Sequence, residues 1–263
     1  MIFAKSVSLS SASVFFAALA LCACSARPPK PAPNVQAAAP QANDLAPPSL
    51  DTVRIGPRGV VLSGVTQPGV KVRLASPAGQ EIFAAAGAEG RWSIDLPPAA
   101  EPRIFGLSAT VGERRVQAQG YILVSPSGQA ALLRAGAGAL RIDPGVSPGL
   151  RAVDFDRGGG MEVSVAAPPG ATVILRLDGR QVAEGRADGN GRYEASLGSP
   201  DPVQAGPHQI QIAGDGFTDQ ALVQVSPAAP LAQGPLRSQL TSAGLRVDWM
   251  TPGGGEQSTL IVH

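Results

Sequence analysis

The stretch "QPGVKVRL", residues 67–74, places a Pro-Gly pair directly before an alternating run of apolar and charged residues. The apolar members of the run, Val70, Val72 and Leu74, fall on one face of an extended chain, and the charged members fall on the other. A period of two predicts a strand with one face in a core and one face in water. The Pro-Gly pair predicts a turn before that strand.

The same pattern returns about a hundred residues later. "PPGATVIL", residues 168–175, aligns with the first stretch at an offset of 101 positions. "EGRWSIDL" at 89–96 and "NGRYEASL" at 190–197 align at the same offset, which matches Trp92 with Tyr193. A constant offset across two separate blocks predicts two copies of one β unit.

The order of a Pro-Gly turn, an alternating strand, a polar turn and a Gly-Arg-aromatic strand start resembles the bacterial Ig-like domains of cell-surface and envelope proteins. The resemblance covers residues 53–125 and 150–226 and implies two β-sandwiches of about seven strands each. The 32 Gly and 25 Pro suit short strands joined by turns. We therefore expect an all-β fold with two Ig-like domains. The family provides spacers, stalks, adhesion modules and appendages to enzymes, so the resemblance does not select a function.

Two segments lie outside these domains. Residues 126–149 connect them, and "QAALLRAG" within this segment fits either a strand or a short helical turn. The C-terminal extension, residues 227–263, ends in "GLRVDWMTPGGGEQSTLIV", which echoes "GLRAVDFDRGGGMEVSV" at 149–165. Both stretches predict hairpins closed by a triple-Gly turn. We expect the last hairpin to pack on the second sandwich or to begin a third, incomplete unit.

Residues 1–23 have the features of a secretion signal. Lys5 precedes the apolar run "VFFAALALCA", residues 14–23, which is too short for a permanent membrane span of about 20 apolar residues. The run contains Cys22 and ends directly before Cys24, and this end resembles the bacterial lipobox, in which an aliphatic residue and two mostly small residues precede the cysteine that receives lipid. This resemblance implies a lipoprotein signal peptide. A plain secretory signal with two accidental cysteines is the alternative.

The position of the small residue distinguishes the two cysteines. Cys24 follows Ala23, a small residue at the cleavage site, whereas Cys22 follows the bulky Leu21. We therefore expect lipidation at Cys24, although Cys22 at the middle position departs from the commonest lipobox. Cleavage before Cys24 leaves no free thiol for a disulfide, a zinc site or a nucleophile.

Residues 24–52 form a Pro/Ala-rich linker with hardly any bulky apolar residue. Such a segment cannot bury a core, and a chain of this length reaches between roughly 30 Å when flexible and ~85 Å when fully extended. In lipoproteins of this kind, Ser25 directly after the cysteine implies sorting to the outer membrane of a Gram-negative cell. The predicted location is therefore the cell outer membrane, facing the periplasm or the surface, with the folded domains held off the membrane.

The charge balance argues against nucleic-acid binding. The chain has 21 Lys and Arg against 20 Asp and Glu, and removal of Lys5 with the signal peptide leaves 20 of each. The longest basic cluster is the pair Arg114 and Arg115, whereas phosphate recognition needs a basic stripe. We expect the membrane, through the lipid, and an envelope protein or glycan as partners.

Candidate catalytic residues are few. "GVSPG" at 145–149 matches the pattern of a hydrolase nucleophile elbow around Ser147, but Pro148 lacks the backbone N–H that this site needs after the serine. His208 is expected on a surface strand edge, and His263 is the last residue; we expect neither to have a nearby Ser or Asp arrangement that would form a triad. Asp154 and Asp156 share one face of a predicted strand, where we prefer solvated residues to a catalytic pair.

Cofactor and metal motifs are incomplete. "DGNG" at 188–191 begins like a calcium loop but lacks the further acids and distal Glu, so we interpret it as a hairpin turn. "AGAGAL" at 135–140 lacks the strand, third glycine and helix of a dinucleotide site, and we expect it only to be flexible. No cofactor and no metal site is predicted.

We expect the two tryptophans to lie in different environments. Trp92 lies on an inward strand face, which indicates a core residue. Trp249 is a candidate contact for a glycan or protein partner because it lies next to a Gly-rich turn, but Leu245, Val247 and Trp249 share one face as a buried stripe would.

We expect a lipid-anchored envelope protein that acts as a non-catalytic structural or interaction module. A peptidoglycan- or carbohydrate-binding accessory module is the alternative, and an enzyme ranks third.

Overall fold

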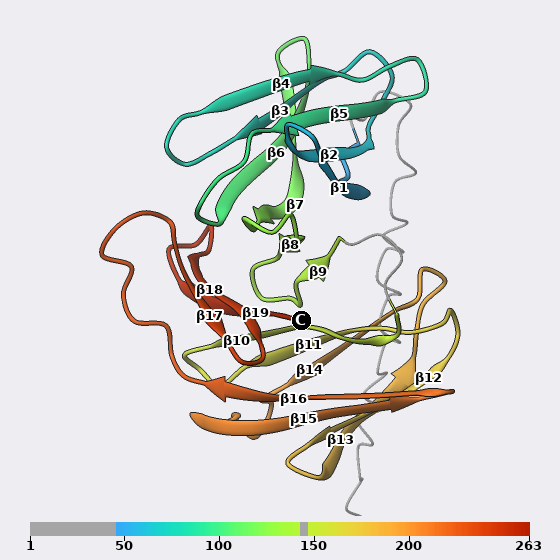
Figure 1. The fold of residues 1–263 in the computed structure, drawn as a ribbon, viewed down its shortest axis with the longest axis vertical. Coiled ribbons are helices and arrows are strands. Elements are labelled where there is room, and N and C mark those ends of the chain that lie inside the picture. Colours follow the sequence, from blue (N-terminus) through green and yellow to red (C-terminus); the bar gives the residue numbers. More distant parts are fainter. Residues whose placement is uncertain (1–45, 143–146) are drawn as a thin grey trace, which may run out of the picture. The chain divides into compact units, whose positions relative to one another are not determined.

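The computed structural model describes residues 46–142 and 147–263, and the only regular elements in these ranges are β-strands (Figure 1). The predicted signal peptide, Cys22, Cys24, Ser25 and most of the linker lie outside the described residues. The strands form four antiparallel sheets, which we name A to D. The fold is all-β, as the alternating pattern predicts.

The first sandwich consists of sheets A and B. Sheet A has the order β1-β2-β5, and sheet B has the order β4-β3-β6-β7-β8-β9. The strands are β1 (Thr52–Gly56), β2 (Gly59–Val65), β3 (Lys71–Ala75), β4 (Glu81–Ala85), β5 (Arg91–Leu96), β6 (Arg103–Val111), β7 (Arg114–Val124), β8 (Ala130–Leu133) and β9 (Leu140–Arg141).

The second sandwich consists of sheets C and D. Sheet C has the order β14-β11-β10-β19-β18-β17, and sheet D has the order β13-β12-β15-β16. The strands are β10 (Gly149–Asp156), β11 (Met161–Ala166), β12 (Thr172–Leu177), β13 (Arg180–Arg186), β14 (Arg192–Leu197), β15 (Gly206–Gly214), β16 (Phe217–Val225), β17 (Leu236–Thr241), β18 (Gly244–Met250) and β19 (Glu256–Val262).

The two sandwiches repeat each other in strand order and register. The first seven strands of each, β1–β7 and β10–β16, form the two Ig-like units. Trp92 of β5 pairs with Gly64 of β2, and Tyr193 of β14 pairs with Val165 of β11, at the same offset. The predicted internal repeat is therefore present in the pairing of the strands.

A glycine explains why the repeated motif begins with Gly-Arg-aromatic. Gly90 has φ +75° and Gly191 has φ +73°, in the left-handed region. A Cβ at Gly90 would lie 2.0 Å from the carbonyl oxygen of Thr66, and a Cβ at Gly191 would lie 2.5 Å from the equivalent oxygen of Ala167. Only glycine fits both the conformation and the close approach.

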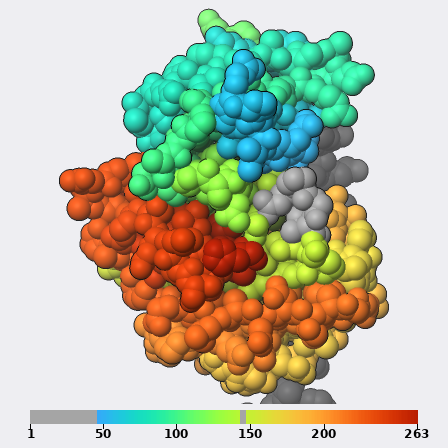
Figure 2. Space-filling model, in the orientation of Figure 1, coloured from blue at the N-terminus to red at the C-terminus, as the bar shows by residue number. Residues whose placement is uncertain are grey.

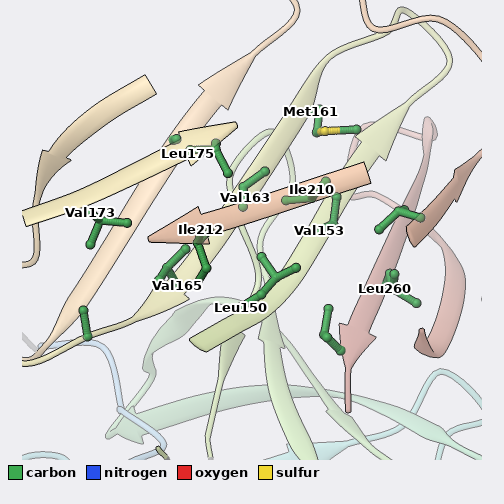
Figure 3. Packing of buried hydrophobic residues seen from close by; sticks show 14 of the residues in the cluster. Leu150, Val153, Met161, Val163, Val165, Val173, Leu175, Ile210, Ile212 and Leu260 are labelled. Carbon is green, nitrogen blue, oxygen red and sulfur yellow. The ribbon is translucent and has the colours of Figure 1, made fainter. Parts of the chain in front are cut away.

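The core of the second sandwich lies between sheets C and D. In Figure 3, side chains of β10 and β11 point toward those of β12 and β15. Val163 and Leu175 have no exposed surface, and Leu150 is 1% exposed. The first sandwich has an equivalent core between sheets A and B, in which Trp92 is 2% exposed.

Two segments differ from their expected form, and a third takes one of the two forms left open. Residues 48–51, assigned to the linker, run along β2, where Ser49 N–H donates to the Val65 carbonyl at 2.9 Å. The stretch left open between strand and helical turn contains β8, which pairs with β7. The turn at 188–191 connects β13 and β14, which lie in different sheets, so it is not a hairpin turn.

The C-terminal strands complete sheet C. β18 and β19 form the predicted hairpin around the second triple-Gly segment, and β10 and β11 form the equivalent hairpin around the first. β19 then pairs with β10, from Ala152 opposite Ile261 to Asp156 opposite Gln257. The hairpin therefore packs on the second sandwich by extending its sheet, together with a third strand, β17, that the sequence analysis does not foresee.

Candidate functional site

A third apolar cluster, which we name the inter-sandwich cluster, contains residues from sheets B and C. Its fully or nearly fully buried members come from β6, β7, β8 and the segment before β9 on one side, and from β10, β18 and β19 on the other. They are Ile104, Leu123, Ala131, Leu133, Ala139, Ala152, Val247, Trp249 and Ile261. Sheet B thus buries both of its faces in part, one against sheet A and one in this cluster.

Trp249 is the largest member of the inter-sandwich cluster. Its side chain has no exposed surface, and its ring meets that of Tyr121 edge-on, with centroids 6.0 Å apart and an interplanar angle of 82°. Its Nε1–H donates to Oγ1 of Thr259 at 3.0 Å. Trp249 is therefore part of a buried stripe and not an exposed contact. Its side chain offers no surface to a glycan or protein partner.

Asp154 lies beside this cluster and is not solvated, contrary to our expectation. It is 2% exposed, because side chains of the neighbouring strand β19 and the backbone of the turn before β9 surround its carboxyl group. Oδ1 accepts hydrogen bonds from Thr259 Oγ1 and from Gln257 Nε2, the latter at 3.1 Å, and Oδ2 accepts from the Ala139 N–H at 2.6 Å. Burial raises the pKa of Asp154 to about 6, although these three hydrogen bonds and Arg134 oppose the shift.

The turn from Arg134 to Ala139 is fixed by this network rather than free. Gly136 N–H donates to Gln257 Oε1 at 3.1 Å. Arg134 donates through Nε to the Gly138 carbonyl at 2.7 Å and forms a 2.6 Å ion pair with Glu194 of β14. The expectation that the "AGAGAL" stretch is only flexible is therefore wrong, because a buried carboxylate and an amide side chain hold its backbone.

Asp156 has a different environment from Asp154. It is exposed at the end of β10, and its Oδ1 accepts hydrogen bonds from the N–H groups of Gly158 and Gly160 at 2.8 and 3.0 Å. Both aspartates and Glu162 line a cavity of about 100 Å³, which suits a few water molecules rather than a sugar ring. Each aspartate accepts hydrogen bonds from backbone N–H groups of a turn. These bonds explain the position of both aspartates without a catalytic role.

A second buried carboxylate, Asp248, escaped the sequence analysis. It is 5% exposed on β18 and accepts hydrogen bonds from Arg237, Arg246 and Ser258 at 2.6, 2.9 and 2.7 Å. Burial alone would raise the pKa of Asp248, but these donors outweigh burial and lower it. Arg246 also donates to the Ser226 side chain and carbonyl, so the pair fastens the segment after β16 to the C-terminal strands.

His208 has an aspartate partner, but its other ring nitrogen contacts a backbone carbonyl rather than a serine, so the pair is not part of a triad. His208 lies on β15, an inner strand of sheet D, and its Nδ1 lies 2.7 Å from Oδ2 of Asp178. Nε2 lies 2.8 Å from the Gln204 carbonyl oxygen. Burial lowers the pKa of His208, but the bonds to Asp178 and Gln204 outweigh burial and raise it. Both partners are acceptors, so the geometry fits an imidazolium that donates twice.

The remaining candidate residues show no catalytic arrangement. Ser147 is exposed, its carbonyl accepts a hydrogen bond from Arg151, and β10 follows it where an elbow would need a helix. Within the described ranges, no three His, Cys, Asp or Glu side chains group to hold a metal ion. Across the same residues, no helix has the length and apolarity to cross a membrane.

Searches against known proteins identify no family. No family model matches the chain, and no curated protein matches it. Three solved structures are similar over most of this chain. A BSP domain of a biofilm-associated protein has 12% identity and a TM-score of 0.25, with 70% of this chain and 30% of that chain covered. A tetra-tandem repeat of the extending region of a large adhesion protein has 17% identity and a TM-score of 0.24, with 82% and 56% covered.

The third is a central fibronectin-III array of a RIM-binding protein, with 11% identity, a TM-score of 0.25, and 84% of this chain and 90% of that chain covered. This chain thus spans less than two thirds of the biofilm-associated and large adhesion structures. At TM-scores of 0.24 and 0.25 the likeness carries no argument about function. The assignment to Ig-like β-sandwiches rests on the strand order and pairing described above.

Proposed function

We propose that the protein is a lipid-anchored envelope protein whose two sandwiches act together as a non-catalytic structural or protein-interaction module. The observation that carries this proposal is the inter-sandwich cluster. Trp249 is fully buried there and its apolar neighbours are fully or nearly fully buried, with residues of both sandwiches in contact. A rigid body of two fused sandwiches is suited to hold or present a surface at a distance from the membrane.

The anchor in this proposal is Cys24. The apolar run before it and the small Ala23 support lipidation, and Ser25 supports the outer membrane as destination. Several acyl chains, at ~0.8 kcal/mol per buried methylene, anchor a protein stably without a transmembrane helix. The Pro/Ala-rich linker then sets the distance between the lipid and β1.

The polar groups with displaced pKa values support the non-catalytic part of the proposal. Asp154 and Asp248 are buried and saturated with donors, and the His208 imidazole is held between two acceptors. Catalytic acids and bases need access to a substrate. Here each of these groups fastens one segment of backbone to another, which is a structural use.

The second candidate function is a carbohydrate- or peptidoglycan-binding accessory module. One observation favours it, a hollow of about 460 Å³ on sheet D lined by amide, hydroxyl and guanidinium groups, including Gln211, Gln220, Thr218 and Arg176. Such groups hydrogen-bond to sugar hydroxyls. Pull-down on purified sacculi by the Gln211→Ala, Gln220→Ala double variant tests it, with Gln239→Ala on β17 as the control. Loss of binding only in the double variant would favour this function over a spacer.

Membrane partitioning of two cysteine variants tests the leading proposal. We expect the wild type and Cys22→Ala to remain with membranes after a high-salt wash and to incorporate a labelled fatty acid. Cys24→Ala should lose the label and the membrane association. If Cys24→Ala still partitions with membranes and carries lipid, the anchoring proposal is wrong.

A further inference from the structure

A groove of about 500 Å³ lies beside β17, an edge strand of sheet C. Three segments line it: Ser76–Ala78 in the turn between β3 and β4, Glu101–Ile104 at the start of β6, and Pro235–Ser238 at the start of β17. Pro77, Ala78, Pro102, Ile104, Pro235 and Leu236 make much of this lining apolar. The C-terminal strands, in orange and red, form part of the visible surface in Figure 2.

β17, whose first residues line this groove, has one open edge. Within the described residues β17 pairs only with β18, from Leu236 opposite Trp249 to Thr241 opposite Gly244. Met250 N–H donates to the Pro235 carbonyl at 3.0 Å. Because inward and outward backbone groups alternate in an antiparallel ladder, the N–H and C=O groups of Leu236, Ser238 and Leu240 face the open edge. These groups are ready to pair with another extended chain.

The side chains of β17 do little to protect this edge. Natural edge strands avoid pairing through lysines, prolines or bulges, but the strand "LRSQLT" has no lysine or proline and no break in its register with β18. Leu240 is 74% exposed, a large fraction for a leucine on a strand. Arg237 is the one charged residue of the strand, and it is already paired with Asp248 at 2.6 Å.

Arg103 brings a positive charge to the same groove. Its Nη2 donates to the Pro97 carbonyl at 2.8 Å and its guanidinium lies 5.6 Å from the ring centre of Phe105, but its Nε is buried without a hydrogen-bond partner. Burial lowers the pKa of Arg103. Glu101 also lines the groove but is exposed. A carboxylate brought by a ligand would give the guanidinium a charged acceptor.

We infer that this groove binds an extended peptide segment of a partner protein, which adds a strand to β17 and places an acidic side chain against Arg103. Main-chain hydrogen bonds to Ser238 and Leu236 supply affinity, and the apolar wall and Arg103 supply specificity. This inference names the partner of the interaction module proposed above and rests on that proposal. A second copy of β17 is a poorer occupant, because residues 236–241 contain no acid for Arg103.

Fluorescence polarisation with two synthetic peptides tests the inference. The probes are heptapeptides of alternating valine and threonine with either glutamate or lysine at the centre, and the protein is the full chain in detergent. We expect the glutamate peptide to bind better than the lysine peptide. Ser238→Pro, which removes an outward N–H from the edge without touching the ladder to β18, should weaken binding by about tenfold or more, whereas Ser238→Ala should bind as the wild type does.

Arg103→Gln provides a second variant that leaves the backbone of β17 intact. It should abolish the preference for glutamate over lysine, and an unchanged melting temperature would show that it is folded. The inference is overturned if neither peptide binds, if both bind equally well to the wild type, or if Ser238→Pro binds normally. A dimer that sedimentation detects in the wild type and not in Ser238→Pro would instead assign the edge to a second copy. None of these results depends on Cys24. Peptide binding therefore tests the groove, and membrane partitioning tests the lipid anchor independently.

Discussion

The indole Nε1–H of Trp249 donates a 3.0 Å hydrogen bond to Oγ1 of Thr259, and the Thr259 hydroxyl in turn donates to Asp154. All three side chains are buried, at 0%, 0% and 2% exposure. The largest apolar residue of the inter-sandwich cluster is therefore linked through Thr259 to the buried carboxylate beside it. Apolar packing and hydrogen bonds at this position therefore hold the same three strands together, β10, β18 and β19.

Replacement of Trp249 by phenylalanine should cost more stability than the same change at Trp92. Both indoles are buried, but only the Nε1 of Trp249 has a hydrogen-bond partner. Trp249→Phe removes that bond, which is worth about 1 kcal/mol, in addition to packing. Urea unfolding of the two variants measures the difference. Equal losses would show that the bond to Thr259 adds nothing to stability.

Asp154→Asn should flatten the pH dependence of stability in mild acid. The folded pKa of about 6 lies above the ordinary 3.8, so the folded state holds a proton that the unfolded state releases. The stability from Asp154 is then full below about pH 4 and decreases as pH rises through 6, by about 3 kcal/mol in total. We expect the wild type to lose stability from pH 4 to pH 7 more steeply than the variant.

The amide of Asp154→Asn cannot satisfy all three donors. At pH 4 the Asp154 carboxyl group of the folded wild type is protonated, yet both of its oxygens can still accept from Thr259, Gln257 and Ala139, whereas the amide nitrogen of asparagine only donates. The variant should therefore be less stable than the wild type at pH 4 and lose part of this deficit at pH 7. Unfolding free energies at both pH values provide the measurement. Parallel pH curves would contradict the assignment of this titration to Asp154.

His208→Gln should remove a separate pH dependence at higher pH. The pKa of His208 is raised above 6.5 by its bonds to Asp178 and the Gln204 carbonyl, net of burial. Its contribution to stability is present below pH 6.5 and is lost as pH rises through the raised value. The melting temperature of the wild type should fall across this window more than that of the variant. The NMR titration of His208 provides a direct check, and a pKa below 6.5 would contradict the geometry.

The sequence predicts the repeated part of the fold well because local rules determine it. The offset of 101 residues locates equivalent turns, and Gly90 and Gly191 share positive φ and the same close approach. Alternation then identifies the inward faces of β3 and β5, where Val72, Leu74 and Ile94 are buried. Each of these features depends on residues near one another in the chain.

The inter-sandwich cluster and the Asp154 network depend on contacts between distant residues. Thr259 and Gln257 lie more than 100 positions from Asp154, so no local pattern predicts that β19 covers it. An alternating polar residue is expected to face water, and that rule fails where two sheets bury the same strand. One signal was available: the continuous apolar runs at 121–124 and 260–262 are typical of strands with both faces buried.

We expect the two sandwiches to unfold as one body because the inter-sandwich cluster joins them. Differential scanning calorimetry of the full chain in detergent, with wild type and Trp249→Ala side by side, tests it most directly. We expect one cooperative transition for the wild type. Trp249→Ala should lose about 3–5 kcal/mol and separate into two transitions, one for each sandwich. Two transitions in the wild type, or a single unshifted transition in Trp249→Ala, would contradict the claim.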